Sequence, residues 1–349
     1  MPNLPRMSRR GVTLLVAGAG VVVAALAAAL VPVPYVILSP GPTLNTLGRT
    51  SSGPLISITG HPTYQTSGHL NLVTVSFLGG PGDGFNIFTA IRAWLTPHDA
   101  VVPEEELFPS GQSEQQVVQQ DTEQMASSQE TATAAALCTL GIPFTTVDTV
   151  TQTEKGLPAA GVLRARDRII AVDGTPVSCR QDTGTLIRRH RPGSTVQLTI
   201  QRKNATRHVT LKTASSQGNT VIGVFVSENY RFPFRVKYRV GNIGGPSAGM
   251  MFALGVVDKL TPGSLTGGKF VAGTGEIAAD GAVSAIGGIQ QKMAGARAAG
   301  ATIFLTPAAN CADTKGSVPT GLHLAKVSTL RQALNDLAAI RAGRSVPGC

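Results

Sequence analysis

The chain has 349 residues, enough for a terminal segment and about two domains. A composition of 42% hydrophobic and 14% charged residues excludes an intrinsically disordered protein. The net charge of +10 is uneven, with twelve basic and three acidic side chains but no aromatic residue between Lys155 and Lys212. Because nucleic-acid sites combine basic with aromatic side chains, we expect no nucleic-acid partner.

An uncharged segment lies near the N-terminus, from Gly11 to Leu38. Residues 12–33 are almost entirely Val, Ala, Leu and Gly, enough for the ~20 residues that a helix needs to cross a bilayer. Arginines precede this segment at positions 6, 9 and 10, and no Lys or Arg follows until Arg49. The positive-inside rule therefore predicts a single-pass protein of the cell membrane with a cytoplasmic N-terminus and an extracytoplasmic remainder.

A cleaved signal peptide is the alternative interpretation of the same segment. Small residues at Ala25, Ala27 and Ala29 offer a cleavage site. The apolar run is longer than the roughly 7 to 15 residues of a signal-peptide core, which favours a retained anchor. Either interpretation places the rest of the chain in the same compartment.

Four cysteines fit an oxidising compartment: Cys138, Cys179, Cys311 and Cys349. Their spacing matches no metal-binding pattern, so we expect no metal site. Pairing Cys138 with Cys179 and Cys311 with Cys349 would keep each bridge within one predicted domain. Four cysteines allow three pairings, and the sequence does not choose among them.

Two elements are predicted before the middle of the chain. Alternating apolar residues predict a strand over 68–78, followed by a Gly-Pro-Gly turn and a short helix over 87–95. Residues 114–137 are rich in Gln, Glu, Ala and Thr and lack Gly and Pro, which predicts an exposed helix. Gly141 and Pro143 end it.

The next segment predicts a small β-rich domain. Residues 156–174 read G-L-P-A-A-G-V-L-R-A-R-D-R-I-I-A-V-D-G, with a buried strand before a tight Asp-Gly turn. A short helix over 183–190 and a hairpin turning at Lys203-Asn204 follow.

This pattern resembles the core of bacterial PDZ domains over residues 135–213, although Arg166 stands where a glycine commonly precedes the aspartate. The resemblance implies binding of extended peptides, and residues 140–142 are a candidate carboxylate-binding loop.

The segment 241–252 reads G-N-I-G-G-P-S-A-G-M-M-F and predicts that Ser247 opens a helix, with Pro246 at the first helical position. The free N–H groups at such a helix start, those of Ser247 and Ala248, are donors for the oxyanion of an acyl-transfer intermediate. On this motif alone, Ser247 could equally be an ordinary residue at a helix start.

A second glycine-bounded helix is predicted over 287–300. One face collects the apolar side chains and Lys292, and the other takes Gln290, Gln291 and Arg297. The first face comprises Ile289, Lys292, Met293, Ala296 and Ala299. A lysine there either snorkels to the surface or loses its proton, and a neutral amine can act as the general base for a serine.

Together these motifs, with the sequence T-G-E-I between them, resemble the proteolytic domain of Lon proteases over residues 238–307. The resemblance implies Ser247 as nucleophile and Lys292 as base, with Thr274 supporting the pair by hydrogen bonding. It also allows a homo-oligomeric, hexameric ring.

The whole chain resembles bacterial Lon-like, PDZ-containing membrane proteases. The resemblance implies an α+β fold: a cytoplasmic N-terminus and transmembrane helix (1–38), a Lon-type α/β proteolytic domain in two parts (39–134 and 216–349), and a PDZ-like domain between them (135–215). We therefore expect an endopeptidase acting on unfolded or flexible extracytoplasmic proteins and peptides.

No cofactor is expected. Residues 263–269 fit the phosphate-loop pattern G-x-x-x-x-G-K, but Phe270 stands where the magnesium-binding Ser or Thr belongs, so we expect ATP-independent activity. None of the six histidines lies in a catalytic motif, and H-E-x-x-H is absent from the sequence.

The alternatives are a non-catalytic, membrane-anchored PDZ scaffold that binds peptide termini and a signal-peptide-type processing enzyme. The intact Ser247 and Lys292 disfavour the scaffold, and the G-P-S-A-G helix start disfavours the processing enzyme.

Overall fold

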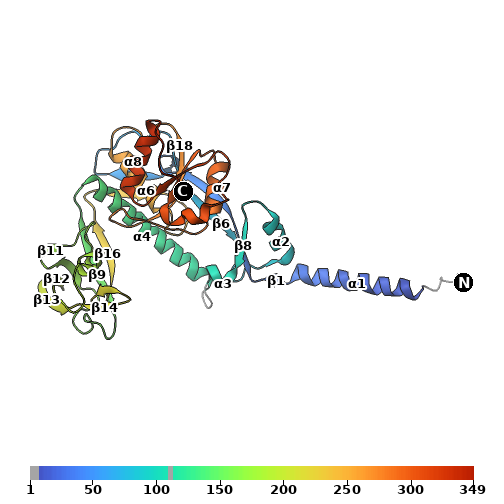
Figure 1. Cartoon of the computed structure of the whole chain (residues 1–349), viewed down its shortest axis with the longest axis horizontal. Coiled ribbons are helices and arrows are strands. Elements are labelled where there is room, and N and C mark those ends of the chain that lie inside the picture. The colour runs from blue at the N-terminus through green and yellow to red at the C-terminus, as the bar shows by residue number, and fades with distance from the viewer. Residues whose placement is uncertain (1–7, 109–112) are drawn as a thin grey trace.

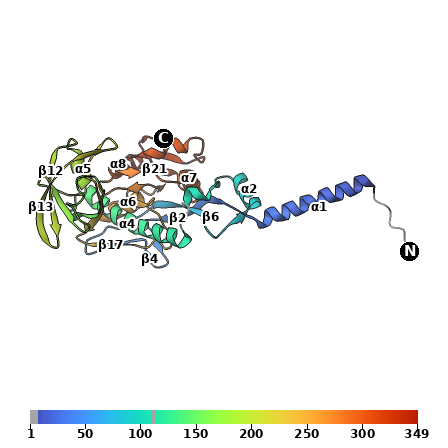
Figure 2. The ribbon, with the colours of Figure 1, turned by 90° about the horizontal axis from the view of Figure 1, so that it is seen from below.

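The computed structural model describes residues 8–108 and 113–349, which form a long N-terminal helix, a large body and a small body (Figure 1). Figures 1 and 2 agree that the helix extends from one end of the large body and that the small body lies at the other end.

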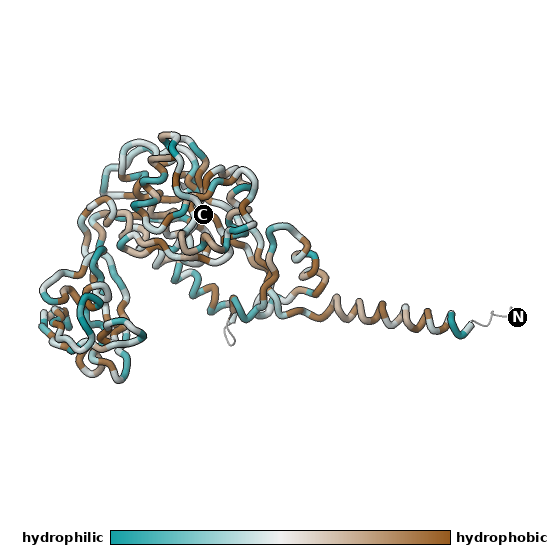
Figure 3. Tube along the Cα trace, viewed as in Figure 1, coloured by the Kyte–Doolittle hydropathy of each residue, from teal (hydrophilic) through white to brown (hydrophobic). Residues whose placement is uncertain are grey.

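The N-terminal helix α1 covers Arg9–Leu30, and the Ser8 hydroxyl accepts a hydrogen bond from the Gly11 N–H at its start. Its 22 residues rise about 33 Å, which matches a hydrocarbon core of ~30 Å. None of them is buried against the rest of the protein, and Figure 3 shows the helix as largely hydrophobic. By length and composition α1 can cross a membrane, although a signal sequence meets the same criteria.

The large body is built on a six-stranded sheet in the order β22-β21-β18-β6-β2-β8. The first four of these strands run parallel, and β2 and β8 complete the sheet by antiparallel pairing. The strands are β2 (Tyr35–Asn45), β6 (His69–Leu78), β8 (Ala100–Pro103), β18 (Phe270–Gly273), β21 (Ile303–Pro307) and β22 (His323–Val327). Strands from both sides of the small body in the sequence therefore share one sheet.

Helices cover both faces of this sheet because its side chains alternate between two cores. Leu70 and Leu72 of β6 pack with helices α4 (Glu114–Leu140), α6 (Gly249–Leu260) and α8 (Leu330–Arg341). Val73, the next residue, points to the opposite face and packs with α7 (Ile289–Ala298).

Helix α4 confirms the helix predicted over 114–137, and its expected exposure is wrong for the second half. Ser113 and Gln116 form a capping box at its start, and Gly141 ends it with a left-handed φ of 71°. Residues 134–137 are fully buried, and the small side chains of the alanines at 134–136 let α4 approach α6 closely. The polar composition that predicted exposure describes the first turns only.

The small body is a sheet in the order β13-β12-β10-β9-β16 with one short helix and its own core. Its elements are β9 (Thr145–Thr153), β10 (Arg168–Val172), β11 (Thr175–Pro176), α5 (Thr183–Arg188), β12 (Thr195–Arg202), β13 (Ala205–Lys212), β14 (Ala214–Ser216), β15 (Asn219–Val221) and β16 (Val224–Arg231). The predicted hairpin is confirmed, with Lys203 and Asn204 both at positive φ in its turn.

Strand β16 lies beyond the boundary expected at residue 215 but belongs to the small body's sheet, because it pairs along its length with β9. The side chains of Ile222 and Val224 also join the small body's core.

Short elements complete the large body and its junction with α1. They are β1 (Pro32–Val33), β3 (Arg49–Thr50), β4 (Gly53–Pro54), β5 (Ile56–Thr59), β7 (Phe85–Asn86), α2 (Ile87–Leu95), α3 (Glu104–Leu107), β17 (Arg235–Tyr238), β19 (Glu276–Ile277), β20 (Val283–Ser284) and the 3-10 helix η1 (Ala308–Thr314). The predicted strand over 68–78 and helix over 87–95 are thus β6 and α2.

Two disulfides join Cys138 to Cys179 and Cys311 to Cys349, one of the three pairings that the sequence allowed. Cys138 lies in the last turn of α4, whereas Cys179 follows β11. Both cysteines of the first bridge lie within the segment 135–215 predicted for the small domain, although Cys138 itself belongs to helix α4. That bridge attaches the small body to a core helix of the large body.

Candidate active site

Ser247 lies in a turn immediately before α6. The sequence predicted that this serine opens the helix, but α6 begins at Gly249. The Gly249 N–H instead donates to the Pro246 carbonyl (3.2 Å), which closes a turn around Ser247 and Ala248. The half-buried serine therefore precedes the helix by two residues.

Neighbouring elements hold the backbone of this turn. The Ser247 carbonyl accepts hydrogen bonds from the Gly275 N–H (2.8 Å) and from the Thr274 hydroxyl (3.0 Å). The Ser128 hydroxyl, on α4, donates to the Pro246 carbonyl (3.0 Å). Thr274, expected to support the catalytic pair, thus bonds to the main chain of the serine, which orients the turn.

Within the described residues, the N–H groups of Ser247 and Ala248 donate to no backbone or side-chain acceptor. Two adjacent free donors at the start of a helix form a site that favours negative charge.

Lys292 occupies the first turn of α7, and only 4% of it is exposed. Among the described residues no carboxylate lies within ion-pair distance of its ammonium group. Burial lowers the pKa of Lys292 to about 8, because an uncompensated positive charge is costly away from water. Roughly a tenth of this lysine is therefore neutral at pH 7, far more than of an exposed lysine.

The prediction for the faces of α7 is correct for its buried centre and wrong at two positions. Gln291, expected on the solvent face, is only 5% exposed, and its amide oxygen lies near the left-handed Gly288. Ala299, expected on the buried face, is exposed because the helix ends at Ala298.

Ser247, Ala248 and Lys292 line one cavity of about 1030 Å³. One wall is β6, from Val73 to Phe77, and the opposite wall is the N-terminal half of α4. From α4 the lining residues are Val117, Val118, Asp121, Thr122, Met125, Ala126 and Gln129. The structure thus brings together a serine and a lysine that are far apart in the sequence. The α4 wall was missed, because its polar composition indicated only an exposed helix.

Asp121 is an acidic residue in the lining of the cavity. Its main-chain carbonyl accepts a hydrogen bond from the Gly245 N–H (3.1 Å), which ties α4 to the glycines before Ser247. Burial raises the pKa of the Asp121 carboxyl group.

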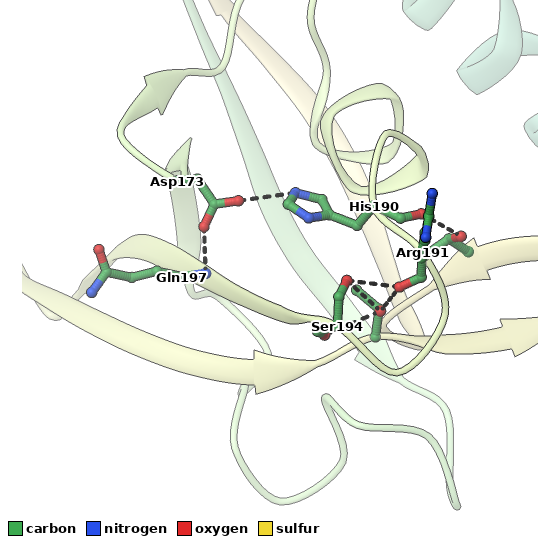
Figure 4. A network of polar contacts seen from close by, with 7 residues as sticks. Asp173, His190, Arg191, Ser194 and Gln197 are labelled. Carbon is green, nitrogen blue, oxygen red and sulfur yellow. Dashed lines mark hydrogen bonds and ion pairs between the residues drawn. The ribbon is translucent and has the colours of Figure 1, made fainter.

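The small body contains the three residue types of a Ser-His-Asp triad close together, but not in a catalytic arrangement (Figure 4). His190 Nε2 pairs with Asp173 Oδ2 (2.9 Å), and the other Asp173 oxygen accepts from the Gln197 N–H (2.8 Å). The Ser194 hydroxyl donates to the Arg191 carbonyl (2.7 Å), not to the histidine. This network stabilises the loops around β12.

A second cavity, of about 520 Å³, lies in the small body between α5 and the edge strand β16. Its walls include Thr183, Ile187 and Arg188 of α5 and residues 219–226. Residues 140–142, the candidate carboxylate-binding loop, lie elsewhere: Gly141 caps α4, and the side chains of Leu140 and Ile142 pack on the large body's core. The segment 222–224, which also has an apolar-Gly-apolar sequence, does line this cavity.

Comparison with known proteins identifies both bodies. A PDZ domain model matches residues 138–213, and the model of the Lon protease (S16) C-terminal proteolytic domain matches residues 240–339. The second match contains Ser247, Thr274 and Lys292. The chain therefore carries a PDZ domain and a Lon-type proteolytic domain, the combination found in a PDZ-containing Lon-like serine protease.

Several solved structures are similar to part of this chain. The PDZ domain of an SdrC-like protein from Listeria innocua is 26% identical, with 23% of this chain and 92% of that chain covered and a TM-score of 0.22. Its counterpart from Listeria monocytogenes is 25% identical, with 23% and 85% covered and a TM-score of 0.22. A solution structure from Geobacillus thermodenitrificans is 28% identical, with 20% and 82% covered and a TM-score of 0.19.

Proposed function

We propose that this protein is a membrane-anchored, ATP-independent serine endopeptidase that cleaves unfolded or flexible extracytoplasmic proteins, with Ser247 as nucleophile and Lys292 as general base. The observation that carries the proposal is that Ser247 and the buried Lys292 line the same cavity. Among residues 8–108 and 113–349, no carboxylate pairs with the lysine, and no acceptor bonds the N–H groups of Ser247 and Ala248.

The chemistry follows from these groups. Neutral Lys292 takes the proton of the Ser247 hydroxyl as the serine oxygen attacks a peptide carbonyl. The N–H groups of Ser247 and Ala248 stabilise the negative oxygen of the tetrahedral intermediate. The lysine proton passes to the leaving amine when the peptide bond breaks, and water then hydrolyses the acyl-enzyme with Lys292 again as base. Thr274 is a positioning residue, since its hydroxyl donates to the main-chain carbonyl of the serine.

The cavity suits an extended polypeptide. Strand β18 pairs with β6 only over residues 69–72 of β6, and residues 73–77 continue along the cavity wall without a strand partner on that side. An extended substrate can bind such an edge through main-chain hydrogen bonds, which requires a locally unfolded chain.

The PDZ domain supplies a second place for peptides. Strand β16 is an edge strand, and its free side lines the cavity beside α5. We assign peptide binding to this groove, with the turn at 222–224 receiving a terminal carboxylate.

One further feature supports ATP-independent activity, and another supports the proposed membrane topology. The segment 263–269 leads into strand β18, whereas a phosphate loop leads into a helix whose N-terminus binds phosphate. The arginines before α1 and their absence after it support a retained anchor with the catalytic part outside.

A hexameric ring is part of the proposal only through the resemblance to Lon-type domains. The molar mass of the detergent-solubilised protein, measured by light scattering, tests it.

Cleavage of fluorescently labelled casein by the full chain in detergent, without nucleotide, tests the proposed activity. We expect Ser247→Ala and Lys292→Ala to lower the rate by about 10³-fold or more, as removal of members of a catalytic unit does. Lys259→Ala is the matched control, because burial also lowers the pKa of Lys259 but this residue does not line the cavity. Equal rates in all four proteins would refute the proposed dyad.

A further inference from the structure

Helix α2 carries an exposed apolar face that the proposed mechanism does not use. Its four members are Phe88, Ile91, Trp94 and Leu95, which are 50%, 46%, 76% and 73% exposed. At about 100° per residue they occupy one arc of roughly 120°. Ala90 and Ala93 point the other way and are buried. The helix therefore packs through its small side chains and turns its large apolar ones outward.

This face lies where α1 leaves the predicted bilayer. Strand β1 starts two residues after α1 ends, and its residue Pro32 pairs with Asn86 of β7. Asn86 is also the N-cap of α2, since its side-chain oxygen accepts from the Thr89 N–H (3.0 Å). Because paired strands are ~5 Å apart, the start of α2 is fixed beside the end of the membrane helix. Figures 1 and 2 show α2 next to this end of α1, and α1 and α2 are in contact.

The charges on α2 and its flanking residues in the sequence fit a lipid surface. No acidic side chain occurs between Asp83 and Asp99, and the one arginine there, Arg92, borders the apolar arc. An arginine in that position can reach lipid phosphates while its methylene groups lie on apolar surface. Tryptophan prefers the membrane–water interface, where its ring is buried and its N–H remains hydrated.

We propose that α2 lies in the headgroup region of the outer leaflet, with Phe88, Ile91, Trp94 and Leu95 facing the acyl chains. This inference rests on the proposed function in one respect, the retention of α1 as an anchor. The membrane then holds the large body at two points, the end of α1 and the face of α2.

The second contact orients the catalytic cavity. Phe77, near the end of β6, and Phe108, after α3, line the cavity. Phe108 also packs against Gly80 in the loop that leads to α2. An α2 helix fixed in the interface therefore sets the distance between this end of the cavity and the bilayer, so that polypeptides near the membrane surface are the substrates within reach.

Trp94 is the single tryptophan of the chain, so its fluorescence reports on α2 alone. The full chain is reconstituted into lipid vesicles that carry bromine on their acyl chains near the headgroups. We expect about two-fold quenching of Trp94 relative to unbrominated vesicles, because interfacial helices bury their apolar face ~5–10 Å deep. Soluble acrylamide should quench Trp94 weakly. Flotation of the protein with the vesicles, measured on the same sample, reports separately on the anchor.

Two variants make the test specific. Trp94→Phe combined with Tyr64→Trp moves the probe to an exposed position before β6, whose ten residues span roughly 33 Å and end near α2. This control should float equally well, lose the lipid quenching and gain acrylamide quenching. Phe88→Ser with Leu95→Ser keeps Trp94 and should reduce lipid quenching without changing flotation.

The possible results separate the hypotheses. Flotation with Trp94 open to acrylamide and untouched by brominated lipid would overturn the inference and leave the anchor standing. Flotation with Trp94 shielded from both quenchers would also overturn it, since a second copy of the chain would then cover α2. Failure to float would refute the anchor and with it this inference, while casein cleavage would still test the dyad.

Discussion

The two globular bodies bury charged side chains in opposite ways. In the PDZ domain, Asp167 is 1% exposed and accepts hydrogen bonds from Arg202 Nε (2.7 Å) and from Arg202 Nη2. Its burial acts to raise its pKa, but the Arg202 hydrogen bond and the Arg164 N–H outweigh burial and lower the pKa. In the proteolytic domain, Lys292 is buried to a similar extent, and burial alone lowers its pKa.

This difference separates a structural charge from one available for chemistry. A paired charge keeps its proton state over the physiological range and stabilises one arrangement of strands. An unpaired buried lysine is destabilised in its charged form, which keeps it near the point of losing its proton. The comparison can be tested by changing either charge.

The largest expected effect on stability comes from Arg202→Met. The change leaves the Asp167 carboxylate buried without its partner, which costs about 3 to 5 kcal/mol. The free energy of unfolding of the PDZ domain, measured by denaturant unfolding at pH 7, gives the loss. Arg207→Met, on the exposed face of β13, is the control and should leave stability nearly unchanged. A loss below about 1 kcal/mol would contradict this prediction, because it would show that the pair contributes no more to stability than an exposed ion pair does.

Lys292→Met should change stability in the other direction. The pKa of Lys292 falls from 10.5 to about 8, so the folded state binds its proton less tightly than the unfolded state does. The cost is complete below pH 8 and disappears as the pH rises to the unfolded value. Removing the charge should stabilise the protein by at most about 3 kcal/mol at pH 7. Unfolding measured at pH 7 and pH 10 checks this, and a gain of the same size at both values would contradict the pKa argument.

The pH dependence of casein cleavage gives the next smaller effect. If neutral Lys292 is the base, kcat/KM should rise with pH and level off above about 8. Below the pKa of Lys292, each pH unit should cost about ten-fold, because only the neutral amine can accept the serine proton. A profile that is flat between pH 6 and pH 9 would exclude Lys292 as the titrating base.

The smallest effect is expected from Thr274→Val, which removes one hydrogen bond to the Ser247 carbonyl. We expect kcat to fall about five- to ten-fold, corresponding to a bond worth ~1 kcal/mol, with KM nearly unchanged. Thr274→Ser should restore kcat because it keeps the hydroxyl. A fall in KM and kcat together, without rescue by serine, would indicate a general packing defect instead.

Some features of the fold could be predicted from the sequence and others could not. Local patterns were sufficient for α4, for the hairpin at Lys203-Asn204 and for the lysine on the buried side of α7, because caps, turns and helical spacing are properties of short segments. The same reasoning misplaced Gln291 and the start of α6. At both positions the first turn of the helix is determined by contacts with other segments of the chain.

The groove proposed for peptides in the PDZ domain shows the same limit. Residues 140–142 and 222–224 both have an apolar-Gly-apolar sequence, so the pattern alone could not separate them. The first is the C-cap of α4 and the second adjoins β16, and only strand pairing distinguishes them.

The sequence by itself determined an apolar N-terminal helix, a PDZ-like segment, and a serine and a lysine in motifs that favour a nucleophile and a base. The helix follows from composition, whereas the PDZ-like segment and the roles of the serine and the lysine follow from short motifs that resemble known families. The tertiary structure alone decided that Ser247 and Lys292 line one cavity, that α4 forms its opposite wall, and that no carboxylate of the described residues pairs with the lysine. Those are relations between distant segments, and desolvation and hydrogen bonding depend on what surrounds a side chain in space.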